Sequence, residues 1–579
     1  MNPINGSEST GFEKAQARRN LFRFLVPSKR VLFGIALFSF STNLLMLTAP
    51  LYMLQVYDRV LTSRSQETLL VLFLLVTGLY AAQAVIDYNR GRLLARLGER
   101  LDGLFAEKMF AYDMKNTIEG SDKNASPLTD LARLRRFMTS NGPASLLDTP
   151  WVPVYLLVLA SLHIILGFVG LVGAIVVVSL AYLADRATRT DLQRSAQIDA
   201  SSGRLHTMST NAAEVVSVLG MEGALANRFA KLRHKGIVAE ASSGNRGAVL
   251  TSVSRGFRLF LQSTILTVGA VLAIQQEISG GVMIAGSIIL GRSLAPIDQI
   301  VGQWRTVAQA RSAFDRLALL LGRASDGPAP FALPKPRGRL VVTDLASAPA
   351  GCKRPVIAGI SFSLEPGDGL GIIGPSGAGK STLARALIGI TKPLAGKIEI
   401  DGASLSQWSP EALGRHIGYL PQDAQLIGDT VADCIARLDP EAQAEDIVQA
   451  ATDAGAHEMI LGLAEGYGTK IGDGGSALSG GQRRRIALAR ALYGEPVLIV
   501  LDEPNSQLDR EGDNALVYAI HKARARGAVV IVVTHRQSAV AAVDSLLLMK
   551  NGTLAGLGKK QAVMQQIARP ARTNNVVQQ

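Results

Sequence analysis

The residues with the clearest chemical meaning lie between positions 374 and 535. The string GPSGAGKS at 374–381 follows an apolar run and fits a phosphate-binding loop, in which glycines let backbone amides surround phosphate groups. A helix is expected to begin at about Lys380, so that its N-terminal dipole also favours phosphate. We expect Lys380 to reach the β- and γ-phosphates of a nucleotide and Ser381 to ligate Mg²⁺. The expected nucleotide contacts of this loop are Gly374, Pro375, Ser376, Gly377, Ala378, Gly379, Lys380, Ser381 and Thr382.

Three further strings supply candidates for hydrolysis. VLIVLDE at 497–503 reads as a buried strand that ends in two carboxylates. Asp502 is expected to hold Mg²⁺, and Glu503 to act as the general base on the attacking water. His535 follows an apolar run and is expected to contact the γ-phosphate, and Gln422, in YLPQD, to contact Mg²⁺ or water. The expected catalytic residues are therefore Glu503, His535 and Gln422, and the expected metal ligands are Ser381, Gln422 and Asp502. A surface acid pair and a packing histidine are the alternatives.

The N-terminal half of the chain carries six apolar runs that could cross a membrane. Hydrophobic residues make up 48% of the 579 residues, and the mean hydropathy is +0.22. The runs lie at about 31–54, 69–86, 152–166, 168–183, 257–274 and 282–300, with a break near 163–167. The first is too long for the apolar region of a signal peptide and lacks a small-residue cleavage site, so we interpret it as an uncleaved span. The alternative is a buried hairpin in a soluble core.

The distribution of basic residues predicts the orientation of these spans. Lysine and arginine are frequent in the N-terminal tail and in the stretches 90–136 and 186–255, whereas 163–167 and 275–281 contain none. The positive-inside bias therefore places both termini in the cytoplasm. The net charge of +13 follows mostly from these loops, which face anionic lipid, and no aromatic-rich basic patch indicates a nucleic-acid partner. The two cysteines, Cys352 and Cys434, are expected to be reduced and buried.

These patterns divide the chain into five parts. We expect a cytoplasmic tail at 1–30, a six-span domain with long helical cytoplasmic loops at 31–321, a proline-rich linker at 322–337, a nucleotide-binding domain at 338–560 and a polar tail at 561–579. Runs of strand type alternate with helical segments in the nucleotide-binding domain, for example at 370–373 and 529–533. The expected fold class is an all-α membrane domain of six helices fused to a cytosolic α/β domain with a phosphate loop.

The string LSGGQ at 478–482 completes a set that resembles the ABC ATPase domain. The resemblance implies that two domains pair head to tail, so that Ser479, Gly480, Gly481 and Gln482 of one chain meet the nucleotide of a second copy, with Asp509 at the seam. Because one complete set is present, a homodimer with two competent sites is implied. The arginine run 483–485 is expected to supply surface and seam contacts. The family usually stacks an aromatic residue on adenine, but the stretch 344–355 contains none, so adenine must be held in another way.

The membrane strings narrow the resemblance to ABC exporters of type I secretion, in the protease-exporter branch of the haemolysin-exporter family. They are MLQVYDRVL at 53–61, LDTPWVPVYLL at 147–157 and GRSLAPIDQ at 291–299, joined by LDEPNSQLD at 501–509, and the resemblance covers about residues 20–560. It implies an ATP hydrolase of the bacterial inner membrane that exports unfolded proteins with C-terminal signals, such as proteases with calcium-binding repeats. The implied cofactors are ATP and Mg²⁺. The implied partners are a second copy, a periplasmic membrane-fusion adaptor, an outer-membrane channel, the secreted protein and membrane lipid. Only about 30 residues precede the first span, so an N-terminal peptidase-like domain is not expected.

Two other functions are compatible with the same motifs. One is a lipid or drug exporter on this fold, and the other is a nucleotide-gated channel or regulator, which would not need a complete hydrolytic set. In the membrane half, Arg292 lies inside the sixth span, where it is expected either to contact the passing chain or to pair with an acid. The alternative is that the sixth span is shifted and Arg292 lies near the membrane interface. The segments 130–141 and 211–221 are expected to contact the ATPase domain, and the alternative for each is an ordinary solvated helix face.

Overall fold

The structure is a computed structural model that describes residues 29–120, 127–324, 333–352, 354–506 and 508–568. The expected N-terminal tail lies almost wholly outside the described residues, as do parts of the expected linker and C-terminal tail. The described residues form two compact units, one of residues 29–115 and 127–324 and the other of residues 116–120 and 333 onward. The domain boundaries expected from the sequence stay predictions.

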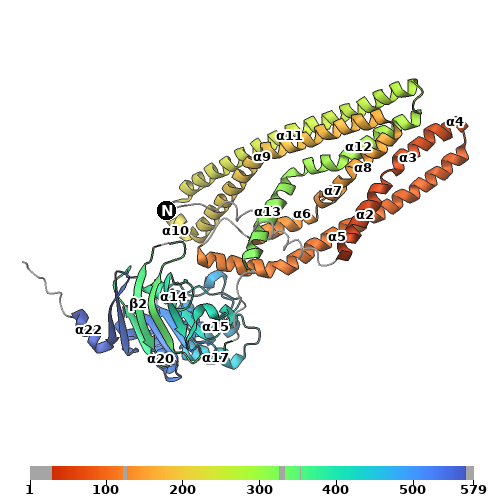
Figure 1. Ribbon diagram of the computed structural model, residues 1–579. Helices are drawn as coiled ribbons and strands as arrows, with labels where there is room; N and C mark the ends of the chain where they lie inside the picture. The colour runs from red at the N-terminus through yellow and green to blue at the C-terminus, as the bar shows by residue number, and fades with distance from the viewer. Residues whose placement is uncertain (1–28, 121–126, 325–332, 353, 507, 569–579) are drawn as a thin grey trace, which may run out of the picture. The chain divides into compact units, whose positions relative to one another are not determined.

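The described residues of the first unit are helical (Figure 1). Its helices are α2 (Lys29–Leu45), α3 (Thr48–Gln55), α4 (Leu61–Ser63), α5 (Gln66–Glu119), α6 (Pro127–Met138), α7 (Gly142–Asp148), α8 (Val152–Leu162), α9 (Ile164–Asn211), α10 (Ala213–Val218), α11 (Glu222–Ile274), α12 (Gly280–Gly302) and α13 (Trp304–Ala324). A π-helical turn, η1 (Val56–Val60), joins α3 to α4, and a 3₁₀ turn, η2 (Thr149–Trp151), joins α7 to α8. Six helical segments are long and apolar enough to cross a membrane, which confirms the six predicted spans.

Three helices are much longer than a bilayer requires. Helices α5, α9 and α11 contain 54, 48 and 53 residues, whereas about 20 residues cross the hydrocarbon core. Their polar portions continue the same helices beyond the apolar portions, and α9 and α11 run side by side (Figure 1). The break expected between the third and fourth spans occurs at His163. Its backbone is extended, with φ of −164° and ψ of 135°, and its Nδ1 accepts a hydrogen bond from the amide of Ile165 at 3.3 Å.

A buried polar network joins the first three spans. The carboxylate of Asp148 accepts hydrogen bonds from Ser39 Oγ at 2.8 Å, Asn43 Nδ2 at 2.8 Å and Arg90 Nη1 at 2.9 Å. The hydroxyl of Tyr155 donates to the carbonyl of Asn43 at 2.7 Å. Ser39, Asn43 and Asp148 are 4%, 1% and 7% exposed, so these polar groups have little access to water and depend on one another.

Replacing Asp148 by alanine is expected to destabilise this unit. The change removes the carboxylate shared by Ser39, Asn43 and the half-buried Arg90. Among the described residues, Arg90 keeps only the weaker pair with Asp87 at 3.4 Å, and loss of one partner from a buried polar network costs about 3 kcal/mol. The free energy of unfolding, measured in detergent by denaturant titration, tests this. Asp102→Ala is the matched control because its partner in the pair, Arg135, is half exposed, and exposed pairs contribute about 1 kcal/mol or less. Equal losses for both variants would contradict a stabilising network around Asp148.

The second unit contains two sheets. In the four-stranded sheet the order is β2–β1–β4–β5 and all pairs are antiparallel. In the six-stranded sheet the order is β10–β9–β3–β8–β7–β6, with parallel pairs from β9 to β6 and an antiparallel β10 at the edge. The strands are β1 (Leu340–Ser347), β2 (Ile357–Leu364), β3 (Gly369–Ile373), β4 (Ala395–Ile400), β5 (Ala403–Ser404), β6 (Ile417–Leu420), β7 (Leu498–Asp502), β8 (Val529–Val533), β9 (Ser545–Lys550) and β10 (Thr553–Lys559).

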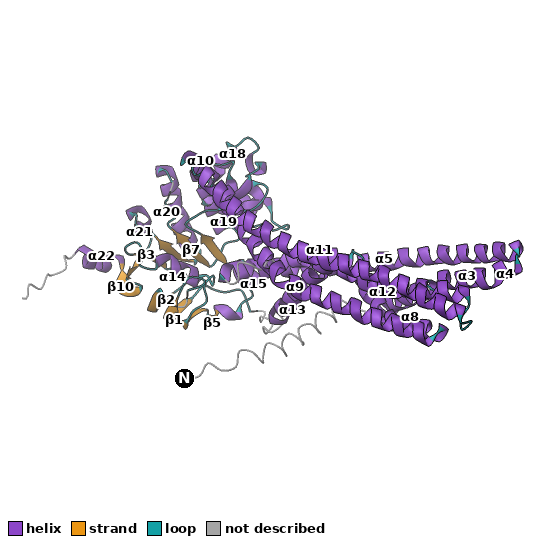
Figure 2. Ribbon diagram, turned by 90° about the horizontal axis from the view of Figure 1, so that it is seen from above, coloured by secondary structure: helices purple, strands orange, loops and turns teal. Residues whose placement is uncertain are grey.

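The central strands are continuous apolar runs because helices and the second sheet cover both faces. Every residue of β7 and β8 is buried, as is typical of parallel strands. Helix α14 packs between the two sheets (Figure 2). The helices of this unit are α14 (Lys380–Leu387), α15 (Pro410–Gly414), α16 (Val431–Ile435), α17 (Ala444–Asp453), α18 (His457–Leu461), α19 (Gly480–Leu492), α20 (Arg510–Ala525), α21 (Gln537–Ala541) and α22 (Lys560–Ala568).

The strand order decides where the polar residues gather. Strands β3, β8, β7 and β6 are successive parallel neighbours, so their carboxyl ends lie at one edge of the sheet, where open α/β sheets bind ligands. The predicted fold class, a six-helix membrane domain fused to an α/β domain with a phosphate loop, is confirmed. Both cysteines are free. Cys434 is buried, but Cys352 is exposed, so the expectation of burial was wrong for that residue.

Candidate nucleotide site

The loop between β3 and α14 has the backbone that a phosphate cradle needs. Gly374 has a φ of 151°, and a Cβ added there would lie 2.3 Å from the carbonyl oxygen of Met549. Gly379 has a φ of 94°, and its Cβ would lie 2.5 Å from Ile357 Cγ2. Only glycine therefore fits at both positions, and the backbone that these glycines allow leads into the N-terminus of α14, where amides and the helix dipole favour an anion.

Lys380 is the buried cation of this loop. The residue is 7% exposed, and its Nζ donates to the carbonyls of Gly374 at 2.8 Å and Pro375 at 2.9 Å. Burial lowers the pKa of its ammonium, although the nearby carboxylates of Glu503 and Asp502 act in the opposite direction. Because charge-assisted bonds to phosphate are stronger than bonds to carbonyls, a nucleotide phosphate can replace these two acceptors.

Asp502 ends β7 with a carboxylate that fits a divalent cation. The residue is 1% exposed, and its Oδ1 has no hydrogen-bond partner among the described residues. Burial raises the pKa of this carboxyl, while a hydrogen bond from the Ser381 side chain acts in the opposite direction. A buried acceptor without a partner needs an explanation, and Mg²⁺ is commonly held by one or two protein oxygens together with substrate phosphates. The oxygens of Asp502 and Ser381 therefore fit Mg²⁺.

The three predicted catalytic residues come together around the carboxylate of Glu503. Gln422, just after β6, donates from Nε2 to Glu503 Oε2 at 3.0 Å. His535, just after β8, places Nε2 3.9 Å from Glu503 Oε1. Glu503 itself has a φ of 48°, a left-handed conformation that a residue with a side chain adopts only when its surroundings impose it. The arrangement can hold a water molecule against a phosphate and accept its proton.

The other predicted loop residues differ in exposure. Pro375, Ser376 and Gly377 are exposed, Ala378 is buried, and Thr382 is half-buried in the first turn of α14. The stretch 344–355, which has no aromatic residue, is followed by Val356, which is 40% exposed. Its carbonyl oxygen is 3.6 Å from the position of a Cβ added to Gly379, so Val356 is the exposed apolar residue next to the phosphate loop.

The LSGGQ string forms the N-terminus of α19. Ser479 is the N-cap: its hydroxyl accepts from the amide of Gln482 at 3.3 Å, while the Gln482 side chain accepts from the amide of Ser479 at 2.9 Å. This capping box occupies the side-chain oxygen of Gln482. Ser479 is exposed, and in the described part of the chain no hydrogen bond joins Ser479, Gly480 or Gly481 to the loop 374–382.

Asp509 occupies the N-cap of α20. Its Oδ1 accepts from the amide of Gly512 at 2.8 Å and from Arg485 Nη2 at 2.7 Å. The hydrogen bond from the Gly512 amide is the larger cause, and that from Arg485 the next, of a pKa of the Asp509 carboxyl below its usual range. Asp509 is exposed, so a second protein chain has access to it.

Arg484 was missed by the sequence reasoning, which placed the whole run 483–485 at the surface or at a seam. That expectation was wrong for Arg484, which is 3% exposed. Its helical position supplies the pattern that identifies it. Ala487, Leu488 and Ala491 follow three, four and seven residues later, and all are buried, so they share one inward face of α19 with Arg484.

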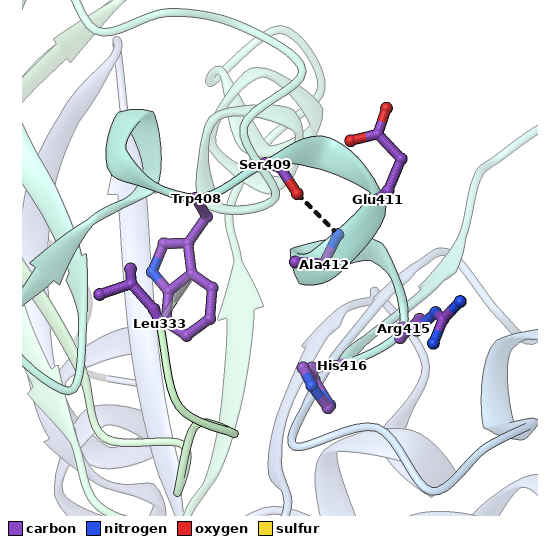
Figure 3. Close-up of a pocket in the computed structure, with 7 residues that line it drawn as sticks. All are labelled: Leu333, Trp408, Ser409, Glu411, Ala412, Arg415 and His416. Carbon is purple, nitrogen blue, oxygen red and sulfur yellow. Dashed lines mark hydrogen bonds between the residues drawn. The ribbon is translucent and has the colours of Figure 1, made fainter. Parts of the chain in front are cut away.

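The cavity in Figure 3 is separate from these motifs. It has a volume of about 390 Å³ and lies between Trp408 and Leu333 on one side and Glu411, Arg415 and His416 on the other. Burial lowers the pKa of His416, and the charges of Lys335 and Arg415 act in the same direction. No nucleotide motif contributes a residue to its lining.

The charged residues of the sixth span do not pair with each other. Asp298 accepts from Arg258 Nη1 at 2.8 Å, whereas Arg292 is exposed and makes no ion pair or hydrogen bond with the described residues. In the segment 130–141, the carboxylate of Asp130 is held inside the first unit by two bonds from Arg316, at 2.6 and 2.7 Å.

Comparison with known proteins identifies the family to which each half of the chain is similar. The ABC transporter family model matches residues 357–506, and the model of the ABC transporter transmembrane region matches residues 32–291. The chain is 41% identical over 541 residues to the type I secretion system ATP-binding protein PrsD of Rhizobium meliloti (strain 1021), with 93% of each chain covered. It is 26% identical over 557 residues to the alpha-hemolysin translocation ATP-binding protein HlyB of Escherichia coli, covering 94% of this chain and 78% of HlyB. A bacterial Atm1-family ABC exporter solved with ATP bound superposes with a TM-score of 0.80 at 22% identity, covering 93% of this chain and 96% of that one, which supports the same fold.

Proposed function

Since the chain belongs to the ABC transporters of type I secretion systems, a multi-pass membrane family that binds ATP and couples its hydrolysis to transport, we propose that it exports unfolded proteins with C-terminal signals. The gathering of Gln422, Glu503 and His535 beside the buried Asp502 carries this proposal, because an exporter needs a complete hydrolytic site. The names of PrsD and HlyB, which refer to type I secretion and to haemolysin translocation, support a polypeptide cargo.

In the proposed site, residues at the ends of different strands have different roles. The amides of the loop 374–379 and Lys380 bind the phosphates of ATP, with Thr382 in the following turn. Ser381, Asp502 and Gln422 hold Mg²⁺, which neutralises charge on the phosphates. Glu503 accepts the proton of the attacking water, and His535 contacts the γ-phosphate.

The proposed working unit is a homodimer in the inner membrane, with both termini in the cytoplasm. Ser479 is exposed at the N-terminus of α19 and is not bonded to its own phosphate loop in the described part of the chain, which fits a contact with a nucleotide on a second copy. Asp509 is exposed as well and would lie at the seam. A periplasmic adaptor and an outer-membrane channel complete the proposed route for the cargo.

Culture supernatants test the export function. We expect cells that lack the chain to lose one or a few secreted proteins from the medium, and cells that regain the native chain to recover them. The lipid composition of the outer leaflet is measured in the same cells. An unchanged set of secreted proteins together with altered lipids would favour a lipid exporter instead.

Arg292 is proposed to face the route of the cargo. It lies near the middle of α12 (Gly280–Gly302), and a charge at the centre of a span costs about 3 kcal/mol or more when it faces lipid. Gln299, seven residues later and on the same helical face, is also exposed. Two exposed polar side chains on an apolar span, of which Gln299 also accepts a hydrogen bond from Ser145 Oγ at 2.6 Å, fit an aqueous path or a protein neighbour rather than lipid.

Replacing Arg292 by glutamate is expected to reduce export about tenfold while ATP hydrolysis continues, since reversing a charge in a low-dielectric path changes its interactions by more than about 1.4 kcal/mol. Arg292→Lys, which keeps the charge, is expected to export nearly as well as the native chain. Secreted cargo per hydrolysed ATP is the quantity to measure. Equal export by both variants would contradict the proposal that Arg292 faces the path of the cargo.

A further inference from the structure

We propose that Arg484 is a positioning residue for ATP hydrolysis: from α19, its guanidinium fixes the backbone that carries Gln422 and Glu503. The inference rests on the catalytic role proposed above for Glu503. It also goes beyond that role, because it places on one side chain the link between the LSGGQ helix and two catalytic loops of the same chain.

Every N–H group of the Arg484 guanidinium has an acceptor. An arginine carries five such donors in a rigid fork. Nε donates to the carbonyl of Pro504 at 3.3 Å, Nη1 to those of Pro421 at 3.2 Å and Gln422 at 2.6 Å, and Nη2 to those of Asp502 at 3.1 Å and Glu503. All five acceptors are backbone oxygens, so the side chain fixes the course of the main chain and leaves the catalytic side chains free.

The five carbonyls belong to the ends of two adjacent strands. Pro421 and Gln422 follow β6, Asp502 ends β7, and β6 and β7 are parallel neighbours. Glu503, next along the chain, has the left-handed φ of 48°. Its amide donates to the carbonyl of Val533 at 2.8 Å, and its own carbonyl accepts from Arg484. The unfavourable conformation is therefore held on both sides, which is the condition under which such a conformation persists.

The charge of Arg484 suits this position better than that of any other side chain. Burial lowers the pKa of its guanidinium, and the nearby carboxylates of Asp502, Glu503 and Asp423 oppose that effect. A guanidinium stays charged even when buried, whereas a lysine ammonium is a point charge with three donors and loses its proton more readily. Lysine at this position would keep a cation but could not satisfy five carbonyls in one plane.

Helix α19 extends this link to Ser479. Arg484 lies five residues after Ser479, or about 7.5 Å along the helix axis. Ser479 is exposed at the N-terminus, and Arg484 holds the loops of Gln422 and Glu503. If Ser479 contacts a nucleotide on a second copy, the movement of α19 reaches the catalytic carboxylate of its own chain through Arg484. Binding at one site would then change hydrolysis at the other, and ATP hydrolysis would be cooperative.

Arg484→Lys in the full-length chain, purified in lipid nanodiscs, tests the proposal. We expect kcat to fall about 100-fold, as for a misplacement of a catalytic group by about 1 Å. The KM for ATP should stay within about twofold of the native value, because no phosphate contact is removed. The Hill coefficient should fall towards one. Arg415→Lys is the matched control, since Arg415 is exposed beside the cavity of Figure 3, outside the nucleotide motifs, and it should retain the native rate.

A double-mutant cycle with Glu503→Gln separates positioning from folding. If Arg484 acts through Glu503, Arg484→Lys should add little to the loss already caused by Glu503→Gln, whereas independent effects would multiply. Multiplied losses, a native kcat with a lowered melting temperature alone, or a chain that fails to fold would each overturn the proposal and leave Arg484 a structural residue. Normal turnover by Glu503→Gln alone would instead refute the role of Glu503, because the loss in Arg484→Lys is measured in the native background.

Discussion

Replacing Glu503 by glutamine is expected to lower the kcat for ATP hydrolysis about 10³-fold, the middle of the range for general-base catalysis, and to leave ATP affinity almost unchanged. Glutamine has the same shape and can still accept the hydrogen bond from Gln422 Nε2, but it cannot take a proton from water. The variant should therefore bind ATP and trap it. Phosphate release and equilibrium nucleotide binding, measured on the same purified chain, test the two halves of this prediction.

Glu458→Gln is the matched control for this variant. It makes the same chemical change at an exposed position of α18, outside the nucleotide motifs, and should retain the native rate. Phosphate release at the native rate by Glu503→Gln would refute the general-base role.

Replacing Lys380 by alanine is expected to weaken ATP binding about 100-fold, which corresponds to the loss of roughly 3 kcal/mol of charge-assisted bonding. The ammonium lies buried at the start of α14, where it contacts the carbonyls of Gly374 and Pro375. Without it, these carbonyls face the phosphates of ATP and repel them. The dissociation constant for ATP, measured with a fluorescent analogue and by competition, is the direct observable.

Lys397→Ala supplies the control, because Lys397 pairs with Glu399 on the surface of β4 and has a side chain that is 56% exposed. The two variants of the site should thus change different measured quantities. Glu503→Gln should change kcat, and Lys380→Ala should change affinity. A Lys380→Ala chain that binds ATP as tightly as the native one would contradict the assignment of this lysine to the phosphates.

Local sequence patterns were sufficient for much of the architecture. The apolar runs at 498–501 and 529–533 became β7 and β8, and the six apolar spans became six helical segments. The site could be predicted from the sequence for a related reason. Its side chains directly follow strands, and in a parallel sheet the carboxyl ends of neighbouring strands meet at one edge. Motif spacing alone was therefore enough to bring Asp502 and Gln422 to the same part of the unit.

Contacts between segments far apart in the sequence could not be predicted in this way. Asp148 meets Ser39 across 109 positions and Arg316 meets Asp130 across 186, and no helical periodicity predicts which charged groups will pair over such separations. The contact expected between the segment 130–141 and the ATPase domain stays a prediction, and within that segment the carboxylate of Asp130 is buried against Arg316. Arg484 illustrates the opposite case. Its inward face could be predicted from helical spacing, but its five carbonyl partners depend on the tertiary fold.

The most direct test of ATP-driven export compares two rates across one set of variants. The secretion rate of the cargo found in culture supernatants is measured in cells that produce the native chain, Glu503→Gln, Arg484→Lys or Glu458→Gln, and the ATPase rate is measured on the same purified chains. If hydrolysis at Glu503 drives export, the two rates should fall together, with Glu458→Gln at the native level and Glu503→Gln close to zero. Secretion at the native rate by the Glu503→Gln chain would contradict the claim that ATP hydrolysis drives export.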